Sequence, residues 1–223
     1  MNTKILYSAL FVAALAVGTY FAIGGTSTPG GTGFDLAAQA QTAEEIDTSS
    51  IVEMTLGDEN APVKVIEYAS FTCPHCASFH QNVFKQLKTN YIDTGKVHFT
   101  YREIYFDKPG LWAGMVARCA GPVRYFGISD ALYAGQSEWL ASRDLTGIHA
   151  DLRKLAVKSG LDGAQVDACL ADAEKAQAMY ALFLKNAEAD GIDSTPSFVI
   201  DGEKHSNMNY EEFTEILDAK LGE

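Results

Sequence analysis

The sequence predicts an α/β fold built from a strand–helix–strand unit, a helical insertion and a closing strand–strand–helix unit. Residues 63–68 (VKVIEY) are a short β-branched run typical of a buried strand, and residues 96–101 (KVHFTY) alternate as a second strand. Between them, over residues 74–92, apolar residues recur every three or four positions, which indicates one face of a helix. Two strands joined by such a helix favour a parallel pair.

The middle of the chain is rich in Ala, Leu and charged residues and is interrupted by glycines. We therefore predict four helices, over residues 111–119, 123–133, 147–159 and 164–189. Together they form an all-helical subdomain inserted at about residues 107–190.

The C-terminal part of the chain returns to strands and ends in a helix. Residues 197–200 (SFVI) are predicted to be a strand, and Asp201-Gly202 is a hairpin signal that leads into an edge strand at residues 204–206. Asn209 is followed three residues later by Glu212, a pattern that resembles a capping box at the start of the last helix.

The N-terminal segment differs sharply from the rest of the chain. Residues 5–23 carry no charge and follow one basic residue, Lys4, so residues 1–24 are predicted to be a signal peptide or an N-terminal membrane anchor. A buried core helix is disfavoured because the next stretch is rich in Gly and Thr, and residues 25–50 are expected to be a flexible linker. Residues 51–223 then form one folded domain on the outer, oxidising side of the membrane.

Charge and cysteine content limit the function classes. The chain has 17 Lys and Arg against 29 Asp and Glu, a net charge of −12, and no basic cluster. This argues against nucleic acid as a partner because phosphate-binding surfaces need clustered basic side chains. Four cysteines suit a redox pair, a metal site, or a structural disulfide beside a reactive pair.

The chemistry is concentrated in Cys73-Pro74-His75-Cys76, at the end of the first strand and the start of the first helix. Proline is favoured at the first helical position, so Pro74 places Cys73 at the N-cap. A thiolate there faces unpaired backbone N–H groups and the positive end of the helix dipole, and its pKa is expected at about 3.5 to 7.5. His75 can add a donor or a partial positive charge, and Cys76 is the expected resolving thiol.

Two other interpretations of this cysteine pair are disfavoured. A zinc site formed by Cys73, Cys76 and His80 would lack a fourth ligand, because Cys119 and Cys169 are isolated in the sequence, and we expect no metal. A purely structural disulfide between residues three apart closes a very small loop and stabilises little.

Three segments together carry a family resemblance. Residues 61–68 (APVKVIEY), 71–76 (FTCPHC) and 195–198 (TPSF) resemble the DsbA family of thioredoxin-fold thiol:disulfide oxidoreductases of the periplasm. The resemblance covers about residues 51–223 and implies a thioredoxin fold with a helical insert. It also implies that a redox-active Cys73–Cys76 disulfide, with no other cofactor, is donated to reduced or unfolded exported proteins. A membrane quinone-linked reoxidase of the DsbB kind would then restore it.

The resemblance also assigns Thr195 and Pro196 to a loop that packs against the active-site disulfide. A cis bond at Pro196 would leave the Thr195 backbone available to an extended substrate. The alternative is an ordinary trans proline at the start of a strand.

Glu67 is a carboxylate in a run that should be buried on both faces, so its pKa is expected to be raised. The resemblance gives it a role in proton transfer beneath the active site, and the alternative is an outward-facing edge residue. Arg102 on the neighbouring strand is a candidate partner. His80 lies one turn beyond Cys76, at a position that can carry an acid in the family, which changes the local charge balance.

Cys119 and Cys169 lie in two different predicted helices of the insertion. In an exported protein the simplest expectation is a disulfide between them, for which loop closure gives about 4 kcal/mol of stabilisation. Two buried free thiols are the alternative.

Three functions remain open at this point. The favoured one is a dithiol oxidase of exported proteins. A disulfide isomerase or reductase of the same compartment is the second, although the short linker leaves no room for a dimerisation domain and a monomer is expected. The third is a non-catalytic polypeptide-binding module.

Overall fold

The computed structural model of the protein describes residues 46–222. The predicted signal or anchor segment, residues 1–24, lies outside the described residues, as does most of the predicted linker. Of the linker, residues 46–50 form a bend and a turn, and Ile46 packs against an apolar cluster that includes Tyr105 and Met179. No helix of the described part is long and apolar enough to cross a membrane.

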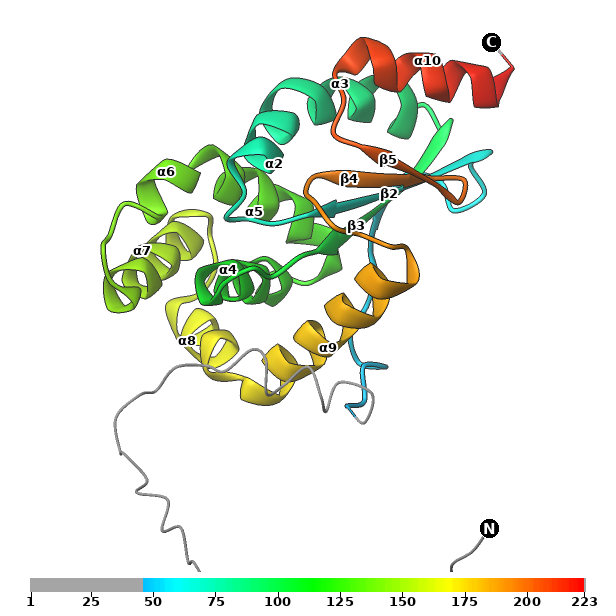
Figure 1. The fold of residues 1–223 in the computed structure, drawn as a ribbon. Coiled ribbons are helices and arrows are strands. Elements are labelled where there is room, and N and C mark those ends of the chain that lie inside the picture. Colours follow the sequence, from blue (N-terminus) through cyan, green and yellow to red (C-terminus); the bar gives the residue numbers. More distant parts are fainter. Residues whose placement is uncertain (1–45, 223) are drawn as a thin grey trace, which may run out of the picture. The chain divides into compact units, whose positions relative to one another are not determined.

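A five-stranded mixed sheet forms the centre of the described domain (Figure 1). Its strands are β1 Met54–Leu56, β2 Val63–Ala69, β3 Val97–Glu103, β4 Ser197–Ile200 and β5 Glu203–Ser206. They are ordered β1-β3-β2-β4-β5. β2 and β3 are parallel, as predicted, and the other three pairings are antiparallel. β1 was not predicted.

Successive residues of β2 point to opposite faces of the sheet, and this decides what each one contacts. Val65 and Ala69 belong to the main core, which also contains Phe79 of the following helix. Tyr68 points the other way, into a small cluster with Phe183. Glu67 has the same parity as Val65 and Ala69, so its side chain enters the main core.

The helix after β2 spans Pro74 to Ile92, as predicted, with two wider turns. It consists of α2 Pro74–Phe79, a π-helical segment His80–Phe84, α3 Lys85–Leu87 and a second π-helical segment Lys88–Ile92. Figure 1 shows α2, α3 and the C-terminal helix α10 (Tyr210–Leu221) on one side of the sheet. Phe198 of β4 packs between them, with ring centroids 4.7 Å from Phe79 and 4.9 Å from Phe213.

The helical insertion contains more helices than the four that were predicted. They are α4 Lys108–Cys119, α5 Pro122–Ala134, α6 Gln136–Trp139, α7 Leu145–Lys158, α8 Gly163–Ala171 and α9 Ala173–Ala189. The single predicted helix over residues 164–189 is wrong, because the chain leaves helical geometry at Asp172. The Asp172 side chain there accepts a hydrogen bond from the backbone N–H of Lys175 and begins a new helix.

The C-terminal elements follow the predicted local signals. Asp201 and Gly202 both have positive φ, 47° and 86°, as a two-residue hairpin turn between β4 and β5 requires. The predicted capping box at the start of α10 is confirmed, because the Asn209 side chain accepts from the Glu212 N–H and the Glu212 carboxylate accepts from the Asn209 N–H.

Candidate active site

The two cysteines lie where β2 gives way to α2, and they differ in exposure. Cys73 is the N-cap of α2, with extended backbone angles (φ −83°, ψ 121°), and Pro74 follows at the first helical position. Cys73 is 9% exposed and Cys76 is fully buried. Pro74 and His75 are exposed on the surface. The Cys73 sulfur is therefore the one that a large partner can approach.

The surroundings of Cys73 lower its pKa to about 5. The largest cause is a hydrogen bond from the Cys76 thiol, and burial acts in the opposite direction. The Thr195 side chain and the backbone N–H groups of Cys76 and His75 lower the pKa further. The sequence predicts stabilisation by the helix N-terminus and by His75, whereas the largest contribution comes from the second cysteine.

Cys76 shows the opposite shift. Burial raises the pKa of its thiol, and the nearby Cys73 and Glu67 raise it further. At neutral pH the pair therefore holds a thiolate at Cys73, which keeps a small exposed fraction, and a thiol at the fully buried Cys76, joined by a hydrogen bond.

The loop before β4 closes the site on the other side of Cys73. The Thr195–Pro196 peptide bond is cis, and the Thr195 carbonyl oxygen lies 3.6 Å from the Cys73 sulfur, where it can accept a hydrogen bond from the thiol form. β4 brings this loop to the cysteines because it pairs antiparallel with β2, with Ser197 opposite Tyr68. The end of β2 and the start of β4 therefore meet at one edge of the sheet.

Gln136, which the sequence did not single out, holds the cysteine loop from the insertion. Its side-chain amide donates to the backbone carbonyls of Phe71 (2.8 Å) and Cys73 (3.0 Å). Gln136 is the first residue of α6, directly after Gly135. The sequence shows only a polar residue after a glycine that interrupts the helix, and this pattern does not indicate a contact with the cysteines.

Glu67 is fully buried, and its nearest charged neighbour is His80. The His80 Nε2 lies 3.4 Å from a Glu67 carboxylate oxygen. The prediction that Arg102 is the partner of Glu67 is wrong. Arg102 pairs in register with Tyr68, on the opposite face of the sheet from Glu67. It binds the Tyr68 hydroxyl, Glu53 and Asp190 instead.

His80 lies between two acids on different elements. Its ring is 2% exposed, and its Nδ1 lies 3.8 Å from the carboxylate of Asp130 on α5, which is 57% exposed. Burial lowers the pKa of His80, but Glu67 and Asp130 together outweigh it, so the pKa is raised. The Tyr133 ring stacks on the imidazole at 4.3 Å and the Phe84 ring packs at 4.5 Å.

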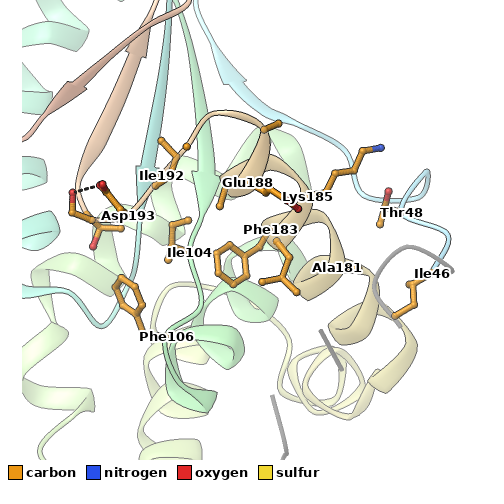
Figure 2. Close-up of a pocket in the computed structure, with 16 residues that line it drawn as sticks. Ile46, Thr48, Ile104, Phe106, Ala181, Phe183, Lys185, Glu188, Ile192 and Asp193 are labelled. Carbon is orange, nitrogen blue, oxygen red and sulfur yellow. Dashed lines mark hydrogen bonds between the residues drawn. The ribbon is translucent and has the colours of Figure 1, made fainter. Parts of the chain in front are cut away.

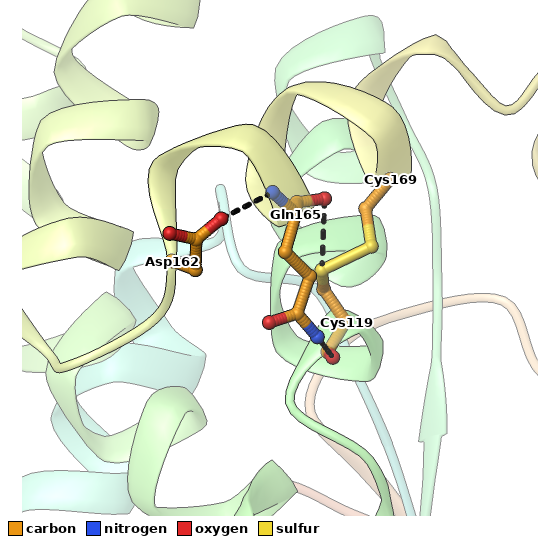
Figure 3. The surroundings of a disulfide bond; sticks show 4 residues. All are labelled: Cys119, Asp162, Gln165 and Cys169. Carbon is orange, nitrogen blue, oxygen red and sulfur yellow. Dashed lines mark hydrogen bonds between the residues drawn. A yellow bond between two sulfur atoms is a disulfide. The ribbon is translucent and has the colours of Figure 1, made fainter.

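Cys119 and Cys169 form a disulfide that joins the last residue of α4 to α8 (Figure 3). The Gln165 side chain donates to the Cys119 carbonyl at 3.0 Å beside this bond. The expected pairing is present, and it ties two helices of the insertion that are 50 residues apart in sequence.

A groove of about 1040 Å³ runs from Thr195 along α9. Ile104 and Phe106, which follow β3, line it together with Phe183 of α9, which lies beside Ile104 (Figure 2). Phe106 is a large exposed apolar side chain. A groove with a partly apolar lining therefore begins at the residue that contacts the Cys73 sulfur.

A mixed sheet with a cysteine pair at the N-terminus of the helix after β2, faced by a cis-proline loop, defines a thioredoxin-fold protein with a helical insertion. The family model described as Thioredoxin matches residues 49–219. The crystal structure of Wolbachia pipientis alpha-DsbA1 is 30% identical with a TM-score of 0.71, and the match covers 81% of this chain and 96% of that one. The chain belongs to the thioredoxin family and is DsbA-like within it.

Curated relatives give the same family. A protein-disulfide oxidoreductase of Rickettsia bellii is 30% identical over 172 residues, covering 77% of this chain and 65% of the relative. One from Rickettsia typhi is 31% identical over 170 residues, covering 76% and 62%. This chain thus spans less than two thirds of the length of these relatives. Bacillus subtilis BdbD, at 20% identity and a TM-score of 0.67, shares the fold.

Proposed function

We propose that the protein is a dithiol oxidase that introduces disulfide bonds into exported proteins through Cys73 and Cys76. The observation that carries the proposal is the opposite pKa shift of the two thiols, with Cys73 lowered to about 5 and Cys76 raised by burial. A stabilised Cys73 thiolate favours the reduced form of the pair, so the oxidised form readily gives its disulfide away.

The reaction has two exchange steps. A client thiolate attacks the Cys73 sulfur of the Cys73–Cys76 disulfide, and Cys76 leaves and takes up a proton. The second client thiolate then attacks the client sulfur of the mixed disulfide, and Cys73 leaves as a thiolate. The client loses two electrons, and the protein gains them. The low pKa of Cys73 makes it a good leaving group in the second step.

The surface around Cys73 fits an extended client chain. At the cis-proline loop, Thr195 offers backbone groups beside the sulfur. The groove that begins there is lined by apolar side chains such as Phe106 and Phe183, which suit apolar side chains of an unfolded protein. In this proposal His75, exposed beside the sulfur, borders the same approach.

The remaining parts of the proposal concern the cell. Residues 1–24 export the domain and either are cleaved or anchor it, so the domain acts on the periplasmic side of the membrane, as a monomer. The Cys119–Cys169 disulfide supports an oxidising compartment. The two electrons gained in each cycle must pass to an oxidant, for which we propose a membrane quinone-linked reoxidase of the DsbB type.

Equilibration of the protein with glutathione buffers, together with oxidation of a reduced, unfolded client protein, tests this function. We expect a reduction potential more oxidising than about −200 mV and rapid oxidation of the client. Cys73→Ser cannot form the Cys73–Cys76 disulfide, so it should show no redox equilibrium with glutathione and no oxidation of the client. A potential near the −270 mV of thioredoxin would overturn the oxidase in favour of a reductase or isomerase. Full client binding without oxidation would instead indicate a binding module.

A further inference from the structure

The resolving cysteine needs a path for its proton. In the proposed reaction, Cys76 takes up a proton when the disulfide opens and releases one when it closes, yet its side chain is fully buried. Burial raises the pKa of Cys76, which makes an uncompensated thiolate at this position costly. Glu67 is close enough for its charge to raise the same pKa. Glu67 is itself fully buried, so it cannot exchange a proton with solvent directly and needs a further group that can.

The Glu67 and His80 side chains meet without hydrogen bonds. Both carboxylate oxygens of Glu67 and both ring nitrogens of His80 are buried and lack a hydrogen-bond partner. A buried acid and a buried imidazole held only for structure would normally have such partners satisfied. The separation of 3.4 Å between the His80 Nε2 and a Glu67 carboxylate oxygen places the two groups as an ion pair when His80 is protonated.

His80 reaches solvent through Asp130. The faces of its ring are covered by Tyr133 and Phe84, and Tyr101 of β3 contacts its edge at 5.9 Å. The Tyr101 and Tyr133 hydroxyls contact each other, and burial keeps the pKa of both well above the usual range, so these phenols stay neutral. Nδ1 instead faces the Asp130 carboxylate at 3.8 Å, and Asp130 is 57% exposed.

We propose that His80 exchanges a proton with solvent through Asp130 each time Glu67 exchanges one with Cys76. This inference rests on the proposed oxidoreductase function. In the reduced protein Cys76 is a thiol, Glu67 is ionised and His80 is protonated. When the disulfide forms, the Cys76 proton passes to Glu67, and His80 releases its Nδ1 proton to Asp130 and then to water.

When the disulfide opens, these proton transfers run in reverse. One proton leaves the protein in the first direction and one enters in the second, matching the thiol that is lost or gained at Cys76. The buried Glu67–His80 pair has no net charge in either state, which avoids a buried unpaired charge during the cycle. His80 is thus a positioning residue that acts through Glu67, and the helical insertion supplies its exit to solvent.

Asp130→Asn is the primary test, because Asp130 is largely exposed and the change conserves its shape. The measurement is the rate at which dithiothreitol opens the Cys73–Cys76 disulfide of the protein itself, as a function of pH. We expect a rate at neutral pH lower by about tenfold, because the Asn amide cannot take up and release the proton as a carboxylate does. Glu138→Gln, an exposed acid on α6, is the matched control and should retain the wild-type rate.

His80→Gln tests whether the imidazole carries the proton, because a purely structural role of His80 would not change the pH dependence. It should slow the same step and remove the pH dependence near neutrality. Its combination with Asp130→Asn should be no slower than His80→Gln alone, because the two residues lie on one path. The pH midpoint of Cys73 alkylation should stay unchanged in Asp130→Asn.

Two results would overturn the proton path. One is a rate of disulfide opening in Asp130→Asn that equals the rate in Glu138→Gln. The other is a double variant in which the effects of Asp130→Asn and His80→Gln multiply. These rates need no client protein. A wild-type protein that fails to oxidise a reduced client would therefore refute the proposed function separately from this inference.

Discussion

At the residue scale, two cysteines three positions apart acquire opposite properties from their places on one helix. Cys73 occupies the N-cap, where backbone N–H groups and the Cys76 thiol stabilise its thiolate. Cys76 lies one turn further into the helix and is fully enclosed by the core. The geometry of a helix start therefore supplies both a reactive thiolate and a protected thiol from a four-residue sequence.

The low pKa of Cys73 predicts how the reduced protein responds to pH. Iodoacetamide should alkylate Cys73 with a midpoint near pH 5, because the thiolate is the nucleophile. The reduced protein should also gain stability relative to Cys73→Ser as the pH rises. The folded pKa of about 5 lies below the unfolded value near 9.0, so the unfolded chain holds more protons between these values.

The gain should be absent below about pH 5, grow between 5 and 9, and be complete above 9. Urea unfolding of both reduced proteins across this range measures it. A stability difference that does not vary with pH would contradict the assigned pKa.

At the element scale, the break between α5 and α6 matters to the site. Gly135 ends α5 and allows Gln136 to begin α6 with its side chain directed at the cysteine loop. The two hydrogen bonds of Gln136 join the insertion to Phe71 and Cys73, two residues of one loop more than 60 positions earlier in the chain. The insertion thus helps to hold the loop from which Cys73 reacts.

Gln136→Ala should lower the free energy of unfolding by about 1 to 3 kcal/mol, because the Phe71 carbonyl loses its partner and the Cys73 carbonyl keeps only the bond from the Ala77 N–H. Urea unfolding of the oxidised protein measures the loss. Gln86→Ala is the control, since Gln86 is exposed and its amide bonds only to a carbonyl one turn earlier in its own helix. Equal losses in the two variants would show that Gln136 does not support the loop.

Other elements show where local sequence signals fail. β1 is only three residues long, too short for a periodic pattern to be recognised, and its pairing with β3 defines it. The break at Asp172 lies inside an Ala-rich stretch that favours helix throughout, and it is marked only by a residue that also occurs on helix surfaces. Strong local signals at Asn209 and at Asp201-Gly202 were sufficient by comparison.

At the scale of the whole domain, the Cys119–Cys169 disulfide joins α4 to α8 within the insertion that carries Gln136 and Asp130. It closes a loop of about 50 residues, so it restricts the unfolded chain considerably. Two helices of the insertion, α5 and α6, supply Asp130 and Gln136 to the site. The insertion must therefore stay folded for these two side chains to keep their contacts there.

Replacing both residues, as Cys119→Ser with Cys169→Ser, should lower the free energy of unfolding by about 4 kcal/mol. Thermal or urea unfolding of the double variant against the oxidised wild type measures the loss, and the double change avoids leaving one unpaired thiol. A loss below about 1 kcal/mol would mean that the unfolded chain is not restricted by this bond.

Features that depend only on neighbouring residues can be predicted from the amino-acid sequence. The α/β order, the parallel pair, the capping box and the place of Cys73 at a helix start all follow from short-range spacing. Strand register and helix packing decided the rest. Whether Glu67 meets Arg102 or His80 depends on which face of β2 carries it, and Asp130 and Gln136 reach the site only because the insertion packs against the sheet. Those contacts join residues far apart in the chain, so only the tertiary structure could show them.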